Sequence, residues 1–293
     1  MPTHLRFDAS TALEYFAILV AEDASLPMLE AALAVAQDDL PGLDPQAVLA
    51  EIDALAERLR RRIPADAVPL QRVRLLNHYF FRELGFGGNV NDYYDRRNSY
   101  LPEVLRTRRG IPITLALLYI EIATQIGLQA SGVSFPGHFL VKLRLHGGTR
   151  PGEVLIDPFD GRSLARAELE ERLAPYRRES GMGDDGLPLG LFLQSAAPRT
   201  VVARLLRNLK EIHRAAEDFA RMLAVQERLV LLLPQAWEEW RDRGLARAEL
   251  GLDEEAAAAD LSIYLKHCGS ADDAAALRAR VAELRREGRA SLQ

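Results

Sequence analysis

The chain has 293 residues, with 37 lysines and arginines against 42 aspartates and glutamates and a net charge of -5. This length allows two domains, and the composition is that of an ordinary globular protein. The charge balance gives no global reason to expect nucleic-acid binding, and the arginine-rich runs at 58–62 and 106–109 are typical of solvated helix faces. No apolar stretch approaches the roughly 20 residues that cross a membrane, so we expect neither a nucleic-acid nor a membrane partner.

The N-terminal sequence and the single cysteine bear on the expected localisation and chemistry of the protein. The first residues, MPTHLRFDAS, lack the basic segment and hydrophobic core of a secretory signal, which predicts a cytoplasmic protein. The single cysteine, Cys268, cannot form an internal disulfide or build a cysteine-rich zinc site. It directly follows His267, and adjacent helical residues do not face each other, so a Cys–His catalytic pair is not expected there. We expect no cofactor.

Four helices are expected before residue 85. The segments 12–22, 27–37, 45–62 and 68–84 repeat apolar residues at spacings of three and four, and prolines mark the breaks between them. The next segment, GFGGNVNDYYDRRNS, concentrates Gly, Asn and Asp and predicts an irregular loop. The segment ITLALLYIEIATQIG that follows it is apolar on nearly all sides, which predicts a helix buried under a sheet and ended at Gly127.

Three short segments after this helix predict an antiparallel sheet. SGVSF, HFLVKLRL and EVLIDPF are rich in branched and aromatic residues, and turns at Pro136-Gly137 and at 147–152 separate them. A further helix is expected at 168–178, followed by a flexible connection, GMGDDGLPLG. We place the end of the first domain at residue 197, with its core at about 76–178.

Residues 198–293 are expected to form a second, helical part. The pattern predicts helices at 201–216, 219–232, 236–250, 254–268 and 272–287. Gly244, Gly251 and Ala256 have the offsets of a tetratricopeptide (TPR) helix pair, in which small residues let two antiparallel helices approach. One recognisable repeat is fewer than the roughly three that an independent solenoid needs, so this part should lean on residues 1–197.

The candidate chemistry lies in an ordered series of turn, helix and strands. Arg109-Gly110-Ile111-Pro112 precedes the buried helix, His138 opens one strand, and Asp157 ends another. This order resembles the transglutaminase-like, papain-related core, in which a cysteine at the helix start is the nucleophile and a histidine and an aspartate act as base and orienting group. More specifically, GFGGNVNDYYDRRNSYLPEVLRTRRGIPITL, VSFPGHFLVKL and LIDPFDG resemble the bacterial SirB-type family, which joins such a core to a TPR segment.

The resemblance implies an α+β fold, mostly α, with a helical N-terminal part, a papain- or transglutaminase-like core with a small antiparallel sheet, and TPR-like helices at the end. It also implies an active-site architecture without its nucleophile. Pro112 stands where the thiolate would be, and a proline there is the usual pattern of the subfamily. His138 and Asp157 match the base and the orienting group, so we expect them to pair. Two ligands without a spacing signature do not predict a metal site.

Thr114 is the hydroxyl nearest to the vacant position. As a nucleophile it would be a weak substitute, because an alcohol ionises far less readily than a thiol and Thr114 points in a different direction from Pro112. The alternative is a structural hydroxyl that bonds to the helix backbone. The loop supplies candidate binding residues that match the family's pattern: Asn89, Asn91, Asp92, Tyr93, Tyr94, Asn98 and Ser99. They could line a cleft beside Pro112 or only form turns.

Three functions remain open at this point. The first, which the absent thiol favours, is a non-catalytic binding or regulatory protein whose cleft at His138 recognises a peptide or small ligand and whose helices hold a protein partner. The second is a hydrolase or amidotransferase that uses His138 and Asp157 to activate water, with Thr114 assisting. The third is an assembly scaffold in which the core is passive.

Overall fold

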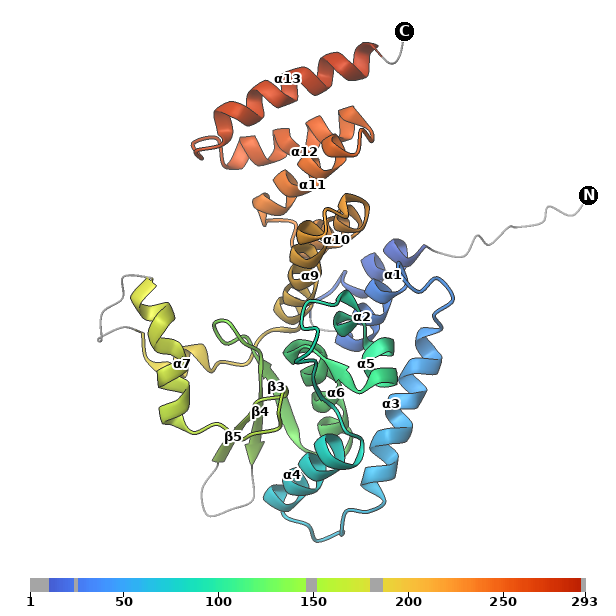
Figure 1. The fold of residues 1–293 in the computed structure, drawn as a ribbon, viewed down its shortest axis with the longest axis vertical. Helices are drawn as coiled ribbons and strands as arrows, with labels where there is room; N and C mark the ends of the chain where they lie inside the picture. Colours follow the sequence, from blue (N-terminus) through green and yellow to red (C-terminus); the bar gives the residue numbers. More distant parts are fainter. Residues whose placement is uncertain (1–10, 24–25, 146–151, 180–186, 291–293) are drawn as a thin grey trace, which may run out of the picture. The chain divides into compact units, whose positions relative to one another are not determined.

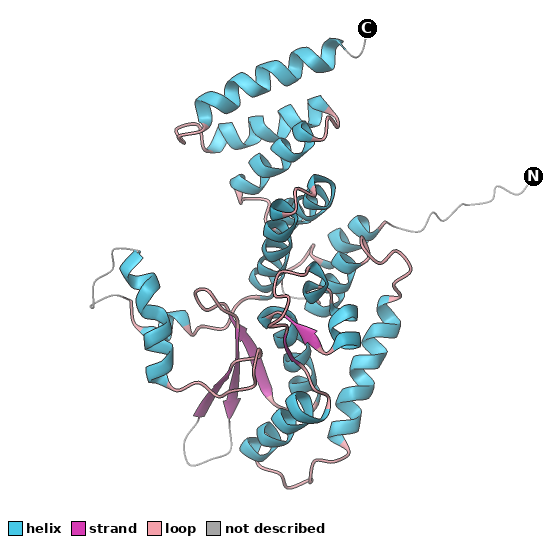
Figure 2. Cartoon of the chain, in the orientation of Figure 1, coloured by secondary structure: helices cyan, strands magenta, loops and turns pink. Residues whose placement is uncertain are grey.

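The computed structural model describes residues 11–23, 26–145, 152–179 and 187–290. These residues are mostly helical and include a three-stranded antiparallel sheet, so the expected α+β class is confirmed (Figure 2). The chain forms two compact units, one of residues 28–36 and 42–205 and the other of residues 1–27, 37–41 and 206–293. The domain boundary after residue 197 stays a prediction.

The helices at the start of the first unit begin where proline or a capping residue allows it. They are α2 (Met28–Ala36), α3 (Pro45–Arg60) and α4 (Pro69–Asn77). The carboxylate of Asp44 accepts a hydrogen bond of 2.9 Å from the N–H of Gln46 and caps α3. The expected helix at 68–84 changes its hydrogen-bonding pattern, because residues His78–Glu83 form a π-helical turn. This wider turn accompanies an aromatic cluster in which Phe80 stacks on Phe86 and meets Tyr119 edge-on.

The segment between α4 and the buried helix holds more regular structure than the sequence predicts. It contains β1 (Gly87–Gly88) paired in parallel with β2 (Arg109–Gly110), a 3-10 turn (Arg96–Ser99) and α5 (Leu101–Thr107). A helix as short as α5 shows too few turns for a periodic pattern to stand out. It ends at Arg108, which takes the left-handed conformation with a φ of 60°.

The buried helix is α6 (Pro112–Gln125), as the sequence predicts. Pro112 occupies the first helical position, where the missing N–H has no intrahelical partner to lose. The helix ends before Gly127, whose φ of 82° lies in the left-handed region that favours glycine. Leu115, Leu118 and Tyr119 are fully buried along α6, so the helix forms the centre of the larger core.

The predicted antiparallel sheet is confirmed, with the strand order β3-β4-β5. Its strands are β3 (Gln129–Val133), β4 (Leu140–Leu145) and β5 (Gly152–Ile156). Val141 and Leu143 of β4 join the core around α6, whereas Leu140 joins a second cluster with residues of α7 (Arg166–Glu179). The sheet therefore lies between α6 and α7 (Figure 1). Most of the turn expected at 147–152 and most of GMGDDGLPLG lie outside the described residues, and Gly152 is the first residue of β5.

The predicted helices after residue 200 are confirmed, and a short helix, α8 (Leu189–Phe192), precedes them. They are α9 (Pro198–Ala215), α10 (Phe219–Leu232), α11 (Trp237–Glu249), α12 (Glu254–His267) and α13 (Ala274–Ala290), and the second unit also contains α1 (Ala12–Leu19). A Cβ on Gly244 of α11 would lie only 3.0 Å from the carbonyl oxygen of Ala257 in α12. The small residue therefore permits the close helix packing that the TPR-like offsets predict.

Among the helices that the structure describes, none combines the length and the hydropathy needed to span a bilayer.

Candidate functional site

His138 and Asp157 form the imidazole–carboxylate contact at the centre of the candidate site. The Nε2 of His138 lies 2.8 Å from the Oδ1 of Asp157. His138 lies in the turn before β4 rather than at the start of the strand, and its N–H donates to the carbonyl oxygen of Phe135 at 3.0 Å. Asp157 directly follows the last residue of β5. The pairing of the two neighbouring strands, β4 and β5, therefore brings the two side chains together.

Three donors converge on the carboxylate of Asp157. Besides His138, the N–H of Phe159 donates to Oδ1 at 3.0 Å and the Nη1 of Arg172 to Oδ2 at 3.0 Å. Burial raises the pKa of Asp157, but the hydrogen bond and charge of His138, together with the bonds from Phe159 and Arg172, outweigh it and hold this pKa below its ordinary value. Asp157 is therefore a carboxylate at neutral pH and accepts a hydrogen bond from His138.

This geometry assigns the two ring nitrogens of His138. A carboxylate has no proton to donate, so the Nε2 of His138 carries the hydrogen in the bond to Asp157. In the neutral imidazole, Nδ1 then holds the lone pair and is the atom able to accept a proton or a ligand hydrogen bond. The His138 side chain is 23% exposed, so part of it is accessible to solvent.

The start of α6 offers no nucleophile in the position that the resemblance indicates. Pro112 and its neighbour Ile113 are buried, and Thr114 is 0% exposed. The hydroxyl of Thr114 donates to the carbonyl oxygen of Asn98 at 2.8 Å or to that of Ile111 at 3.0 Å, and it accepts from the N–H of Ile111 at 3.2 Å. Both hydrogen-bonding functions of this hydroxyl therefore serve the backbone.

The side chain of Asn98 organises the polar loop before α5. Its amide donates to the carbonyl oxygens of Asp92 at 2.7 Å and Tyr93 at 3.2 Å, while its oxygen accepts from the amide of Asn89 at 3.0 Å. Asn98 and Ser99 are buried, and the Ser99 hydroxyl has no hydrogen-bond partner among the described residues. The exposed candidate binding residues of this loop are Asn91, Asp92, Tyr93 and Tyr94.

Several side chains near His138 were not predicted from the sequence to be part of the site. The hydroxyl of Tyr176, on α7, lies where a Cβ on Gly137 would be, directly beside His138. The ring centroids of Tyr93 and Phe159 are 6.1 Å apart. Arg204 of α9 donates from Nη1 to the carbonyl oxygen of Phe135 at 3.1 Å, the same atom that accepts the N–H of His138. Arginines and tyrosines on charged helices give no sequence signal for such roles.

The described residues contain no group of three or more His, Cys, Asp or Glu side chains able to hold a metal ion.

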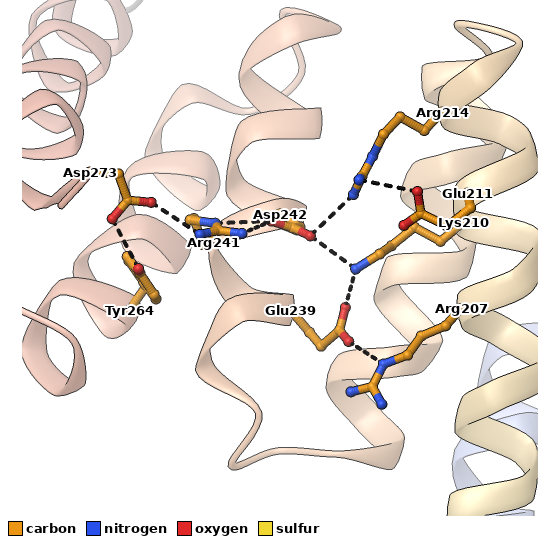
Figure 3. Close-up of polar contacts among 9 residues, drawn as sticks. All are labelled: Arg207, Lys210, Glu211, Arg214, Glu239, Arg241, Asp242, Tyr264 and Asp273. Atoms are coloured by element: carbon orange, nitrogen blue, oxygen red, sulfur yellow. Dashed lines mark hydrogen bonds and ion pairs between the residues drawn. The ribbon is translucent and has the colours of Figure 1, made fainter. Parts of the chain in front are cut away.

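The TPR-like helices contain a second concentration of polar contacts, shown in Figure 3. Lys210 of α9 is buried, and its Nζ lies 2.7 Å from Glu239 and 2.9 Å from Asp242, both on α11. Arg241 contacts Asp242 at 2.9 Å and continues the chain of contacts to Asp273 at 3.1 Å. Lys210 and Glu239, the buried charges of this network, are therefore paired with each other, as a stable interior requires.

A cavity of about 520 Å³ lies beside this network, between residues of α10 and α11. Phe219, Met222 and Leu245 give it apolar walls, while Asp242 contributes charge. Gln226 also lines it, is 1% exposed, and has no hydrogen-bond partner for its Oε1 among the described residues.

Comparison with known families divides the chain into two matches. The family described as transglutaminase-like superfamily matches residues 46–207, and the tetratricopeptide repeat family matches residues 209–282. The first match contains α6, His138 and Asp157, and the second contains the cavity residues.

Relatives cover most of the chain. The UPF0162 protein of Xylella fastidiosa strain Temecula1 is 36% identical over 267 residues, which are 91% of this chain and 92% of that protein. The UPF0162 protein of Vibrio cholerae is 28% identical over 213 residues, covering 73% of this chain and 76% of that protein. F-box only protein 21 of Mus musculus is 43% identical over only 67 residues, or 23% of this chain and 11% of that protein.

No solved structure matches the chain. The family match over residues 46–207 and the full-length similarity to the Xylella protein agree with the His138–Asp157 geometry. The chain therefore belongs to the transglutaminase-like superfamily and carries a tetratricopeptide repeat region after its transglutaminase-like domain.

Proposed function

We propose that this chain is a cytoplasmic SirB-type protein that binds a peptide segment in the cleft beside His138 and a protein partner through its TPR region, without covalent catalysis. The proposed role is binding or regulation. TPR regions generally mediate protein–protein interactions through extended binding surfaces, which supports the second part of the proposal.

The observation that carries the proposal is the state of the first turn of α6. Covalent catalysis requires an exposed nucleophile next to a base. Pro112 has no nucleophilic atom, and the nearest hydroxyl, on Thr114, is fully buried and bonded to the carbonyl oxygen of Asn98. A cleft without a nucleophile retains its shape and its hydrogen-bonding groups, and these suffice for recognition.

The retained pair of His138 and Asp157 favours one second candidate, a hydrolase that activates water. In the neutral ring, the Nδ1 of His138 carries the free lone pair, and Asp157 holds the imidazole in place. General-base catalysis of this kind contributes roughly 10²–10⁴-fold, so slow hydrolysis would need no thiol. The same lone pair is suited to accept a hydrogen bond from the N–H of a bound peptide. We favour binding because recognition of this kind needs no nucleophile.

A peptide-display selection on the purified full-length protein tests the proposal. Sequences enriched on the wild-type protein should be resynthesised and titrated against the wild type, His138→Ala and Lys266→Ala, the last being an exposed residue of α12. We expect binding that weakens at least tenfold in His138→Ala and stays unchanged in Lys266→Ala. Failure to enrich any sequence, or equal binding by all three proteins, would overturn the assignment of the cleft.

A further inference from the structure

Arg204 of α9 presents a half-buried guanidinium group next to the turn that carries His138. Its Nη1 donates to the hydroxyl of Ser134 at 2.8 Å and to the carbonyl oxygen of Phe135 at 3.1 Å. Both acceptors are neutral, and within the described parts of the chain no carboxylate lies within ion-pair distance of Arg204. Burial lowers the pKa of Arg204, although an arginine side chain still stays charged at neutral pH.

Other half-buried arginines of this chain have a charge or dipole partner. The Arg172 guanidinium contacts Asp157 at 3.0 Å, and that of Arg243 contacts Asp260 at 2.7 Å. Arg72 also bonds only to carbonyl oxygens, but one of them belongs to Ile126 at the C-terminus of α6, where the helix dipole favours a cation. The acceptors of Arg204 lie in a turn after β3, and its charge faces the ring of Phe139, whose centroid is 5.7 Å from the guanidinium carbon, rather than a carboxylate or a helix end.

The surroundings of Arg204 adjoin the turn that carries His138. The carbonyl oxygen of Phe135 accepts both the Nη1 of Arg204 at 3.1 Å and the N–H of His138 at 3.0 Å, so the two residues share one atom as their anchor. Tyr93 and Tyr176 lie close enough to interact electrostatically with the guanidinium. The hydroxyl of Tyr176 also covers Gly137, the residue before His138.

The geometry points to Arg204 as a carboxylate-binding group of the cleft, which takes an acidic side chain or the C-terminal carboxylate of the bound peptide beside His138. This inference rests on the proposed binding function. Its bonds to the turn use Nη1 alone and leave Nε and Nη2 without a partner among the described residues. These two groups form the edge of a guanidinium that binds a carboxylate with two parallel hydrogen bonds.

The local charge decides between a carboxylate and a phosphate. The carboxylate of Asp157 is shared between Arg172 at 3.0 Å and His138 at 2.8 Å, so Arg204 is the guanidinium beside this turn that has no carboxylate partner among the described residues. A carboxylate brings one negative charge, whereas a phosphate monoester brings about 1.5 to 2 at pH 7. The singly charged group therefore matches the single free guanidinium.

Titrations with small probes test this inference on the full chain. The probes are N-acetyl-glutamate amide, its neutral analogue N-acetyl-glutamine amide, N-acetyl-glycine with a free C-terminal carboxylate, and inorganic phosphate. The readout is the NMR shift of the Arg204 Nε–H and the dissociation constant. We expect N-acetyl-glutamate amide or N-acetyl-glycine to bind at least tenfold more tightly than N-acetyl-glutamine amide, and the better of the two identifies side-chain or C-terminal recognition.

Variants assign the preference to this side chain. Arg204→Met should remove the preference for the acidic probe, Arg204→Lys should retain part of it, and Arg72→Met, a matched half-buried arginine, should leave it intact. Equal affinity for charged and neutral probes in the wild type, tighter binding of phosphate, or an unchanged preference in Arg204→Met would overturn the inference. Because the wild-type comparison needs no variant, a destabilised Arg204→Met leaves the test decisive.

The two proposals fail separately. Display-selected peptides that require His138 but show no preference for acidic residues would leave the binding function standing and remove the role of Arg204. Failure of the display selection, together with a charge preference that is lost in Arg204→Met, would remove the peptide-binding function and leave the carboxylate-binding role of Arg204 standing.

Discussion

The hydroxyl of Tyr176 occupies the space that a side chain on Gly137 would need. Gly137 has a φ of 66°, in the left-handed region, and the turn it forms places the next residue, His138, opposite Asp157. Both the backbone conformation and the contact with Tyr176 therefore require glycine at this position.

Gly137→Ala should destabilise the protein by about 1–3 kcal/mol, because alanine strains the left-handed backbone and collides with Tyr176. Urea denaturation measures this change. Gly42→Ala is the matched control, since a Cβ there meets nothing within 4 Å. Adding Tyr176→Ala to Gly137→Ala should recover only the part of the lost stability that is due to the collision. Equal stability of Gly137→Ala and Gly42→Ala would show that the turn tolerates a side chain.

The lowered pKa of Asp157 predicts how stability changes with pH. A depressed folded-state pKa contributes stability that is fully present above the unfolded value of about 3.9 and is lost as the pH falls through the folded value. Asp157→Asn should therefore cost about 1–3 kcal/mol at neutral pH, with the difference from the wild type shrinking below about pH 4. Chemical denaturation at a series of pH values measures this difference. A gap that stays constant down to pH 3 would contradict the role of the carboxylate.

Thr114 provides a test that separates structure from catalysis. Thr114→Val keeps the shape of the side chain but leaves the carbonyl oxygen of Asn98 and the N–H of Ile111 without this partner, at a cost of about 1–3 kcal/mol. Thr114→Ser should retain most of the stability because it keeps the hydroxyl. Thermal unfolding of both variants checks the expectation. If Thr114→Val unfolds like the wild type, the hydroxyl is not needed for the fold and its structural role is wrong.

The buried Lys210 in the TPR region should be the most sensitive member of the network in Figure 3. Lys210→Met removes one of the two ion pairs that Glu239, which is 3% exposed, makes among the described residues and leaves the pair with Arg207, so it should cost about 3 kcal/mol. Arg280→Ala removes the exposed pair with Glu283 and should cost less than about 1 kcal/mol. Urea denaturation compares the two. Similar losses in both variants would mean that burial does not strengthen the contribution of Lys210.

The periodic parts of the fold could be predicted because burial imposes their pattern. The spacing of apolar residues located α9 to α13, an almost continuously apolar segment located α6, and short segments rich in branched and aromatic residues between turn signals located the strands of the sheet. The resemblance to the transglutaminase-like core implied that His138 and Asp157 pair, and the antiparallel pairing of β4 with β5 is what brings the two side chains together.

Other parts of the site depend on contacts between distant residues. Arg172 and Arg204 lie on helices rich in charge, where a functional arginine and a solvated one have the same sequence pattern. The π-helical turn at His78–Glu83 follows from aromatic packing, which no local preference signals. The loop residue Asn98 illustrates the same limit, because its amide holds the loop closed from a buried position that composition alone does not reveal.

The most direct test of non-catalytic binding is an activity profile of the purified protein on a broad panel of amide, ester and peptide substrates. His138→Ala and Asp157→Asn serve as matched controls, because either variant disrupts the imidazole–carboxylate pair. The account predicts no turnover that depends on these residues. Turnover by the wild type that is lost in both variants would contradict it and establish a cysteine-independent enzyme.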